Sequence, residues 1–98
     1  MKYTYIDIIV EKIQKETNIK SKDILQMYAL LVLVKGTNIT LSDVHDAWSV
    51  AMNFRGYNPP RCYGHEHTSI VPFDKLSKEC QEKDQKYLNA LIKIAKDI

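Results

Sequence analysis

Apolar residues recur three and four positions apart in several stretches of this 98-residue chain. That spacing places them on one face of an α-helix. The first such stripe consists of Ile6, Ile9, Val10 and Ile13. A chain with this pattern has to fold as amphipathic helices that bury their apolar stripes against one another.

The second helix is predicted over about residues 22–34, with Ser21 as its N-cap. Its second half, from Tyr28 to Val34, is apolar nearly all round, which predicts the central and most buried helix of the fold. Gly36 suits the position just after a helix end, because glycine adopts the left-handed conformation at little cost.

The third helix is predicted to start after Thr40, which would cap it together with Asp43, and to continue to about Phe54. The helical pattern then breaks between residues 56 and 72, where prolines are incompatible with a helix interior.

A last helix is predicted over about residues 78–96, with Ser77 as its cap. The expected fold is therefore all-α: a small compact bundle of about four helices, with a long irregular loop between the third and last helices.

Length and composition limit the class of protein. Ninety-eight residues suit a single domain over 1–98, and an apolar content of 45% is too high for a disordered chain. The net charge of +2, without a lysine block, argues against duplex nucleic-acid binding. The longest apolar stretch is too short to span a membrane, and the N-terminus has no signal-peptide pattern. We therefore expect a cytoplasmic protein, in the host cytoplasm if it is phage-encoded, with Cys62 and Cys80 reduced.

The irregular loop and the helix before it contain most of the candidate chemistry. Arg55 and Arg61 are the two arginines of the chain, and guanidinium groups match phosphate oxygens in bidentate fashion. Aromatic rings stack on nucleobases. The aromatic candidates are Trp48, Phe54, Tyr57 and Tyr63, and the hydrogen-bonding candidates are His45, His65 and His67. Together they indicate a ligand that is anionic and aromatic, such as a nucleotide. The alternative is that the aromatic residues anchor the loop and the arginines are solvated.

Two other chemistries remain as alternatives. Cys62, His65 and His67 form half of a zinc pattern, with His45 or Cys80 as a possible fourth ligand. A nucleophilic Cys62 beside a histidine base is the other, although no signature surrounds it. We expect no metal, no cofactor and no catalytic residue. His45 has two interpretations of its own: it lines the site, or it is buried with a backbone carbonyl as its partner.

Several short strings occur in a fixed order: Val44-His45-Asp46-Ala47-Trp48, Gly56-Tyr57, Tyr63-Gly64 and the stretch from His67 to Leu76 that contains Val71-Pro72-Phe73, with Asp84 downstream. This order resembles the RyR domain, a module named for its repeats in ryanodine receptors. The RyR-like segment would be about 44–95. Thr68 replaces the usual proline, and the spacing around Asn58-Pro59-Pro60 differs from the family pattern.

The resemblance implies a helical, non-enzymatic module of nucleotide-signal and anti-phage systems, and the paired receptor repeats imply a homodimer or higher homo-oligomer. With the loop composition, it predicts binding of a nucleotide-derived signalling molecule, cyclic ADP-ribose-like or a cyclic nucleotide. A phage version would be a sponge that sequesters a host immune signal. The alternative function is a protein-protein interaction module that inhibits a host protein. The predicted ligand-binding residues are His45, Trp48, Phe54, Arg55, Tyr57, Arg61, Tyr63, His65 and His67.

Overall fold

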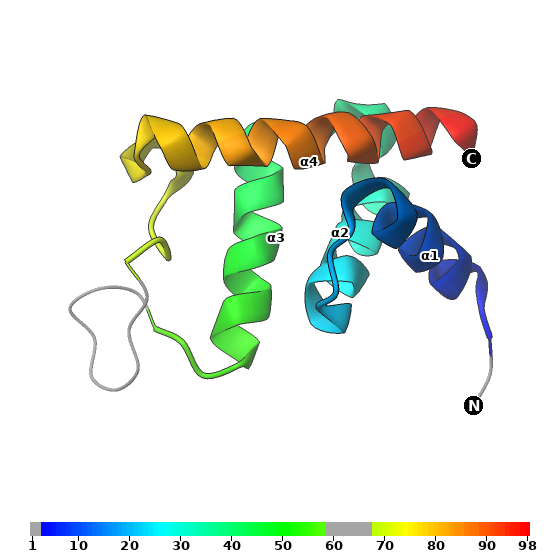
Figure 1. The fold of residues 1–98 in the computed structure, drawn as a ribbon, viewed down its shortest axis with the longest axis horizontal. Coiled ribbons are helices and arrows are strands. Elements are labelled where there is room, and N and C mark those ends of the chain that lie inside the picture. The colour runs from blue at the N-terminus through cyan, green and yellow to red at the C-terminus, as the bar shows by residue number, and fades with distance from the viewer. Residues whose placement is uncertain (1–2, 59–67) are drawn as a thin grey trace.

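The computed structural model describes residues 3–58 and 68–98, and most of them are helical. The elements are α1 (Tyr5–Thr17), α2 (Lys22–Lys35), the 3-10 helix η1 (Gly36–Asn38), α3 (Leu41–Phe54), the 3-10 helix η2 (Phe73–Lys75) and α4 (Lys78–Asp97). Helix α4, orange to red in Figure 1, crosses the other three, and α2 packs between α1 and α3. The prediction of a small all-α bundle is confirmed.

The predicted helix signals at residues 36, 40 and 77 are confirmed. The Thr40 hydroxyl accepts a hydrogen bond from the Asp43 N–H at 3.2 Å, while the Asp43 carboxylate accepts one from the Thr40 N–H at 2.9 Å. The Ser77 hydroxyl accepts from the Cys80 N–H at 3.3 Å. Gly36 ends α2 with a φ of +57°, a left-handed conformation that side chains disfavour. Local chemistry therefore sets where α2 ends and where α3 and α4 begin.

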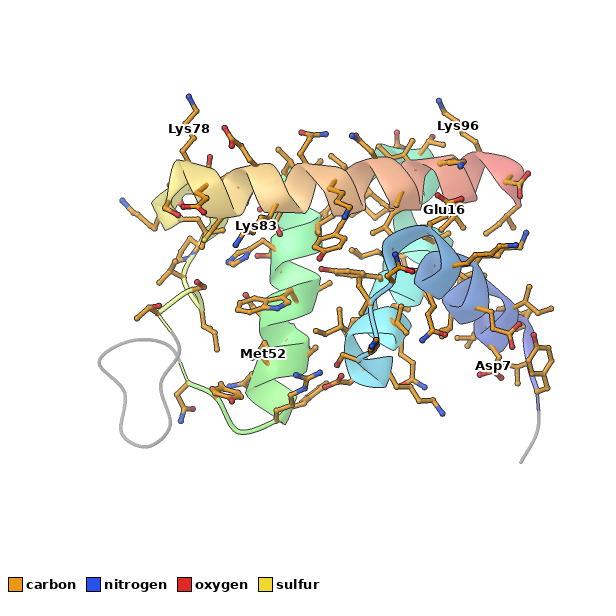
Figure 2. The ribbon with its side chains drawn as sticks, viewed as in Figure 1. Asp7, Glu16, Met52, Lys78, Lys83 and Lys96 are labelled. Carbon is orange, nitrogen blue, oxygen red and sulfur yellow. The ribbon has the colours of Figure 1, made fainter. Side chains whose placement is uncertain are left out.

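One apolar core lies where α4 meets the other helices. Its buried members come from all four: Ile9, Ile13, Leu25, Tyr28, Ala29, Val32, Val44, Ala47, Leu88, Leu91 and Ile94, together with Ile39. Leu91 of α4 and Ile13 of α1 have no exposed surface at all. On its opposite side α4 is polar, and Lys78 and Lys96 point away from the other helices (Figure 2). The amphipathic pattern of α4 thus accounts for its place across the bundle.

Helix α2 is central, as predicted, since it packs against α1, α3 and α4, but the prediction that it is the most buried helix is wrong, because four of its 14 residues are buried and five of the 14 in α3 are. Leu30 is 51% exposed, Val34 is 70% exposed and Leu33 is exposed as well. The neighbouring helices cover only the side of α2 that carries Leu25 and Val32. Within the described residues, no helix combines the length and apolarity that a membrane span requires.

Replacing Leu91 by alanine should lower the free energy of unfolding by about 2–5 kcal/mol, because the change leaves a cavity in a fully buried position. The matched control is Leu30→Ala on the exposed side of α2, which should change it by less than about 1 kcal/mol in dilute solution. Urea unfolding followed by circular dichroism measures both. Equal losses would contradict the burial pattern described above.

Candidate functional site

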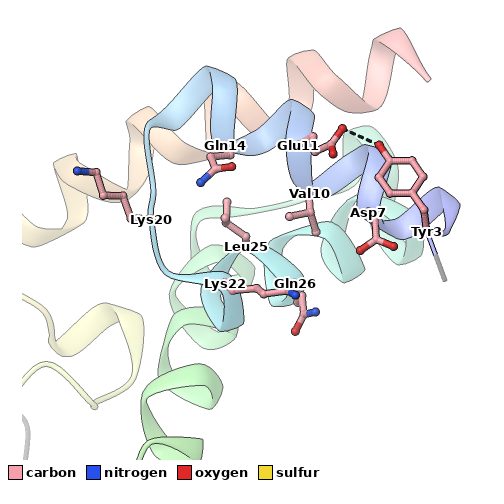
Figure 3. A pocket seen from close by; sticks show the side chains of 9 residues that line it. All are labelled: Tyr3, Asp7, Val10, Glu11, Gln14, Lys20, Lys22, Leu25 and Gln26. Carbon is pink, nitrogen blue, oxygen red and sulfur yellow. Dashed lines mark hydrogen bonds between the residues drawn. The ribbon is translucent and has the colours of Figure 1, made fainter. Parts of the chain in front are cut away.

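A wide groove of about 550 Å³ between α1 and α2 is a first candidate (Figure 3). Its acidic side chains already have local partners. The Asp7 carboxylate accepts a hydrogen bond from the Thr4 N–H at 2.7 Å, and the Tyr3 hydroxyl donates to the Glu11 carboxylate at 2.6 Å. Most of the side chains that line the groove are long, polar and exposed, and none of its polar side chains is buried. The groove is therefore a weak candidate for the specific recognition of a ligand.

A smaller pocket of about 180 Å³ lies where α3 and α4 meet the chain that returns to α4. We name it the His45 pocket. It is lined by Tyr28, His45, Trp48, Ser69, Leu76, Cys80, Lys83, Asp84 and Tyr87. Lys83 is on the side of α4 that faces α3 (Figure 2). Unlike the groove between α1 and α2, this pocket brings aromatic rings and buried polar groups together, as binding sites for small molecules do.

His45 is the polar centre of this pocket, and only 3% of it is exposed. Its Nε2 lies 2.5 Å from the backbone oxygen of Val71 and 3.4 Å from the Ser49 hydroxyl. Since a carbonyl only accepts hydrogen bonds, Nε2 carries a proton and donates it. The other ring nitrogen, Nδ1, lies 3.9 Å from the Asp84 carboxylate. The interpretation of His45 as a buried residue with a backbone carbonyl as its partner is therefore confirmed, and its ring also lines the pocket.

Aromatic rings surround His45. The Trp48 ring stacks on the imidazole, with centroids 5.7 Å apart and an angle of 22° between the planes. Phe73 of η2 approaches the imidazole from another direction, at 6.2 Å and 58°. Tyr28 and Tyr87 form a second, tilted pair with centroids 6.2 Å apart. The three-residue spacing of His45 and Trp48 on α3 produces the stack, because such residues share a helix face.

Burial shifts the ionisation of two groups in the pocket. It raises the pKa of Asp84 above its ordinary value, and the nearby His45 opposes this shift only in part. Burial is also the main reason that the pKa of Tyr28 is raised, with the negative charge of Asp84 as a further cause. Ionisable groups displaced from their ordinary pKa and gathered at a pocket are a general mark of functional sites, although structural networks produce them too.

Arg55, a predicted phosphate ligand, is engaged elsewhere. Its Nε and Nη2 atoms donate to the two carboxylate oxygens of Asp23, each at 2.5 Å, and the Ser21 hydroxyl donates to the same carboxylate. The hydrogen bonds from Arg55 are the main cause that lowers the pKa of Asp23 to about 2. The guanidinium fork thus joins the end of α3 to the start of α2 and faces a carboxylate of this chain.

Of the predicted ligand-binding residues, the structure brings His45 and Trp48 together in the pocket. Phe54, Arg55 and Tyr57 do not line it, and Phe54 is 78% exposed at the end of α3. The remaining predicted residues lie outside the described part of the chain: Arg61, Tyr63, His65 and His67, together with Cys62 of the zinc and nucleophile alternatives. Among residues 3–58 and 68–98, no cluster of three or more His, Cys, Asp or Glu side chains is placed to hold a metal ion.

Sequence reasoning missed the α4 side of the pocket, which Cys80, Lys83, Asp84 and Tyr87 supply. A signal for it exists in the spacing. Positions 80, 84, 87 and 91 share one helix face, so the buried stripe through Leu91 continues toward the start of α4 and includes an acid. An acidic residue within a buried stripe is a stronger candidate for a functional site than an acidic residue on the charged, solvent-exposed face of the helix.

Asp84→Asn should change how stability depends on pH. Because the folded chain holds the proton of Asp84 more tightly than the unfolded chain, this carboxyl destabilises the fold increasingly as the pH rises above 3.8 and through the raised pKa. The variant lacks this effect, so its free energy of unfolding should exceed that of the wild type by a growing margin between pH about 4 and 7. Urea titrations at several pH values measure the margin, and one that stays constant would contradict the raised pKa.

Asp23→Asn should show the opposite sign. The lowered pKa means that this carboxylate stabilises the fold above pH 3.8 and loses that effect as the pH falls toward about 2. The variant should be less stable than the wild type at neutral pH, by up to about 1 kcal/mol since the pair is partly exposed. The same titrations compare the two variants, and each serves as the control for the other. A deficit that persists at pH about 2 would exclude the ion pair as its cause.

Comparison with known proteins changes the family assignment. The interpretation of residues 44–95 as an RyR-like segment is wrong, because the family that matches is another one and no RyR domain is found. The match is to the family described as Domain of unknown function (DUF7701), over residues 4–96. No curated protein and no solved structure matches the chain. Since the match covers nearly the whole sequence, this chain belongs to the DUF7701 family.

Proposed function

We propose that this domain binds a nucleotide-derived signalling molecule without converting it, and that the His45 pocket receives the aromatic part of that ligand. The observation that carries the proposal is the buried His45, which faces the partly buried Asp84 in a pocket that the rings of Trp48, Tyr28 and Tyr87 also line. Aromatic walls suit a flat ring, because stacking on a nucleobase stabilises by about 1–3 kcal/mol. The partly buried Asp84 carboxyl can read the polar edge of that ring.

The volume of the pocket limits how much of a ligand it encloses. At about 180 Å³ it is smaller than the roughly 300–1,000 Å³ of sites that bury a whole drug-sized ligand. One ring system is expected inside, with the charged remainder outside. Lys83 is an exposed cation at the rim and is the described residue best placed to meet a phosphate.

The environment of His45 supports binding over catalysis. A general base has to reach the proton that it removes, directly or through one water molecule. Here Nε2 already donates to the Val71 carbonyl, and Nδ1 faces Asp84, so neither nitrogen is directed at an occupant of the pocket. Binding without turnover suits a sensor or a sponge for a signal.

A thermal-shift screen against cyclic nucleotides and ADP-ribose derivatives tests the proposal, with mass spectrometry of the ligand recovered afterwards. A ligand at 100 times its dissociation constant should stabilise the domain by about 2.7 kcal/mol and be recovered intact. Recovery of an altered compound would make the protein an enzyme. The absence of a shift with every compound would refute the proposal.

Variants locate the site. Trp48→Ala should weaken binding by about 1–3 kcal/mol through the lost stack. Phe54→Ala is the matched control, since it removes an exposed aromatic ring from the same helix outside the pocket and should leave affinity unchanged. Lys83→Gln changes an exposed side chain and should preserve the fold while it weakens a phosphorylated ligand more than its unphosphorylated analogue. Equal effects of the Trp48 and Phe54 variants would exclude the His45 pocket.

A protein-interaction module remains the second candidate, and one observation favours it. The described structure leaves an apolar face uncovered on α2 and α3, and patches of this kind mark contact surfaces. A pull-down that recovers one stoichiometric protein, with no small molecule in the ligand screen, would place this function first.

A further inference from the structure

An apolar groove of about 250 Å³ runs between α2 and α3, on a surface separate from the His45 pocket. Its α2 side carries Met27, Leu30, Leu31 and Val34, spaced as a complete helical stripe. Its α3 side includes Ala47 and Val50, and the exposed apolar side chains that line the groove are those of Leu30, Val34 and Val50. In a monomer, an apolar stripe that stays exposed to water contributes no burial energy to the stability of the fold.

We propose that this α2–α3 groove is the interface of a symmetric homodimer, in which a second copy of the chain covers the same face. The proposal does not depend on the ligand. A two-fold interface needs a surface that is complementary to itself. Here a ridge formed by Leu30 and Val34 borders a hollow at Ala47, so the ridge of each copy can enter the hollow of the other.

The distribution of charge agrees with a partner of the same kind. No charged residue occurs between Gln26 and Val34 in the sequence, so two α2 helices can meet along this stretch without like charges in contact. The charges that border the groove belong to α3, at Asp43 and Asp46, and Lys35 already pairs with Asp43 at 3.4 Å. Charges of one sign in the middle of the stripe would make two copies repel each other. The stripe on α2 carries no charge there.

The area of the face fits a small dimer. Helices α2 and α3 have 14 residues each, which corresponds to a length of about 21 Å. Two such helices side by side are about 20 Å wide, so their common face covers roughly 400 Å² when it is treated as flat. The projecting side chains make the true surface larger. A standard interface buries about 800 Å² on each partner. The face offers about half of that area, so we expect a weak, reversible dimer and not a permanent one.

Sedimentation equilibrium of the full chain without ligand tests the dimer. The wild type should rise from 11.4 kDa to twice that mass as concentration increases. Val34→Glu and Val50→Glu, one from each helix, should raise the dissociation constant at least tenfold. The matched control is Ile8→Glu, an exposed aliphatic residue on α1, which should dimerise like the wild type. Circular dichroism and dilute melting curves confirm that the variants remain folded.

Two results would overturn the proposal. One is a wild-type chain that stays monomeric up to about 1 mM, where even weak specific association becomes visible. The other is folded Val34 and Val50 variants that dimerise as tightly as the wild type. Neither result bears on the His45 pocket, so failure of the dimer and failure of the proposed function can be told apart.

Discussion

The packing of α4 across the other three helices is the constraint on which the rest of the fold depends. Each of α1, α2 and α3 packs against this one helix as well as against a neighbouring helix, and Leu91 of α4 has no exposed surface. Toward the first turns of α4 the residues on this face are no longer leucines but Tyr87, Asp84 and Cys80, which line the His45 pocket. The fold therefore has one continuous surface that is a core at one end and a pocket at the other.

His45 connects this pocket to the chain that leads into α4. This histidine donates a hydrogen bond to the Val71 carbonyl, stacks with Trp48 and faces Asp84, so it joins α3 both to this segment and to α4. A displacement of its ring would also act on the segment before η2, because the imidazole holds the Val71 carbonyl.

Most of the architecture was predictable because it rests on local signals. Apolar spacing indicated the four helices, and the Thr40 and Ser77 caps located two of their starts. The exposed side of α2 was not predictable, since an all-round apolar helix looks the same whether a neighbouring helix or another chain covers it. Half of the pocket was also missed: the spacing of α4 places Asp84 on the buried stripe, but only the fold brings His45 of α3 opposite it.

The family assignment failed for a physical reason as well. The strings around Trp48 and Phe73 contain residues that pack against His45, and unrelated helical domains can need the same local packing. Arg55 shows the limit of composition in the same way: a guanidinium suited to phosphate is equally suited to a carboxylate from a distant helix, and Asp23 supplies one.

The ion pair between Arg55 and Asp23 also makes the two ends of the α2–α3 pair unequal. At one end η1 joins the helices covalently, while at the other they are held by two side chains that are each 37% exposed. Dissolved salt weakens exposed ion pairs and leaves covalent turns unchanged. Concentrated salt also weakens the partly exposed Lys35–Asp43 pair at the η1 end, but there the chain itself still joins the helices, so the end held by Arg55 and Asp23 is the one that loosens.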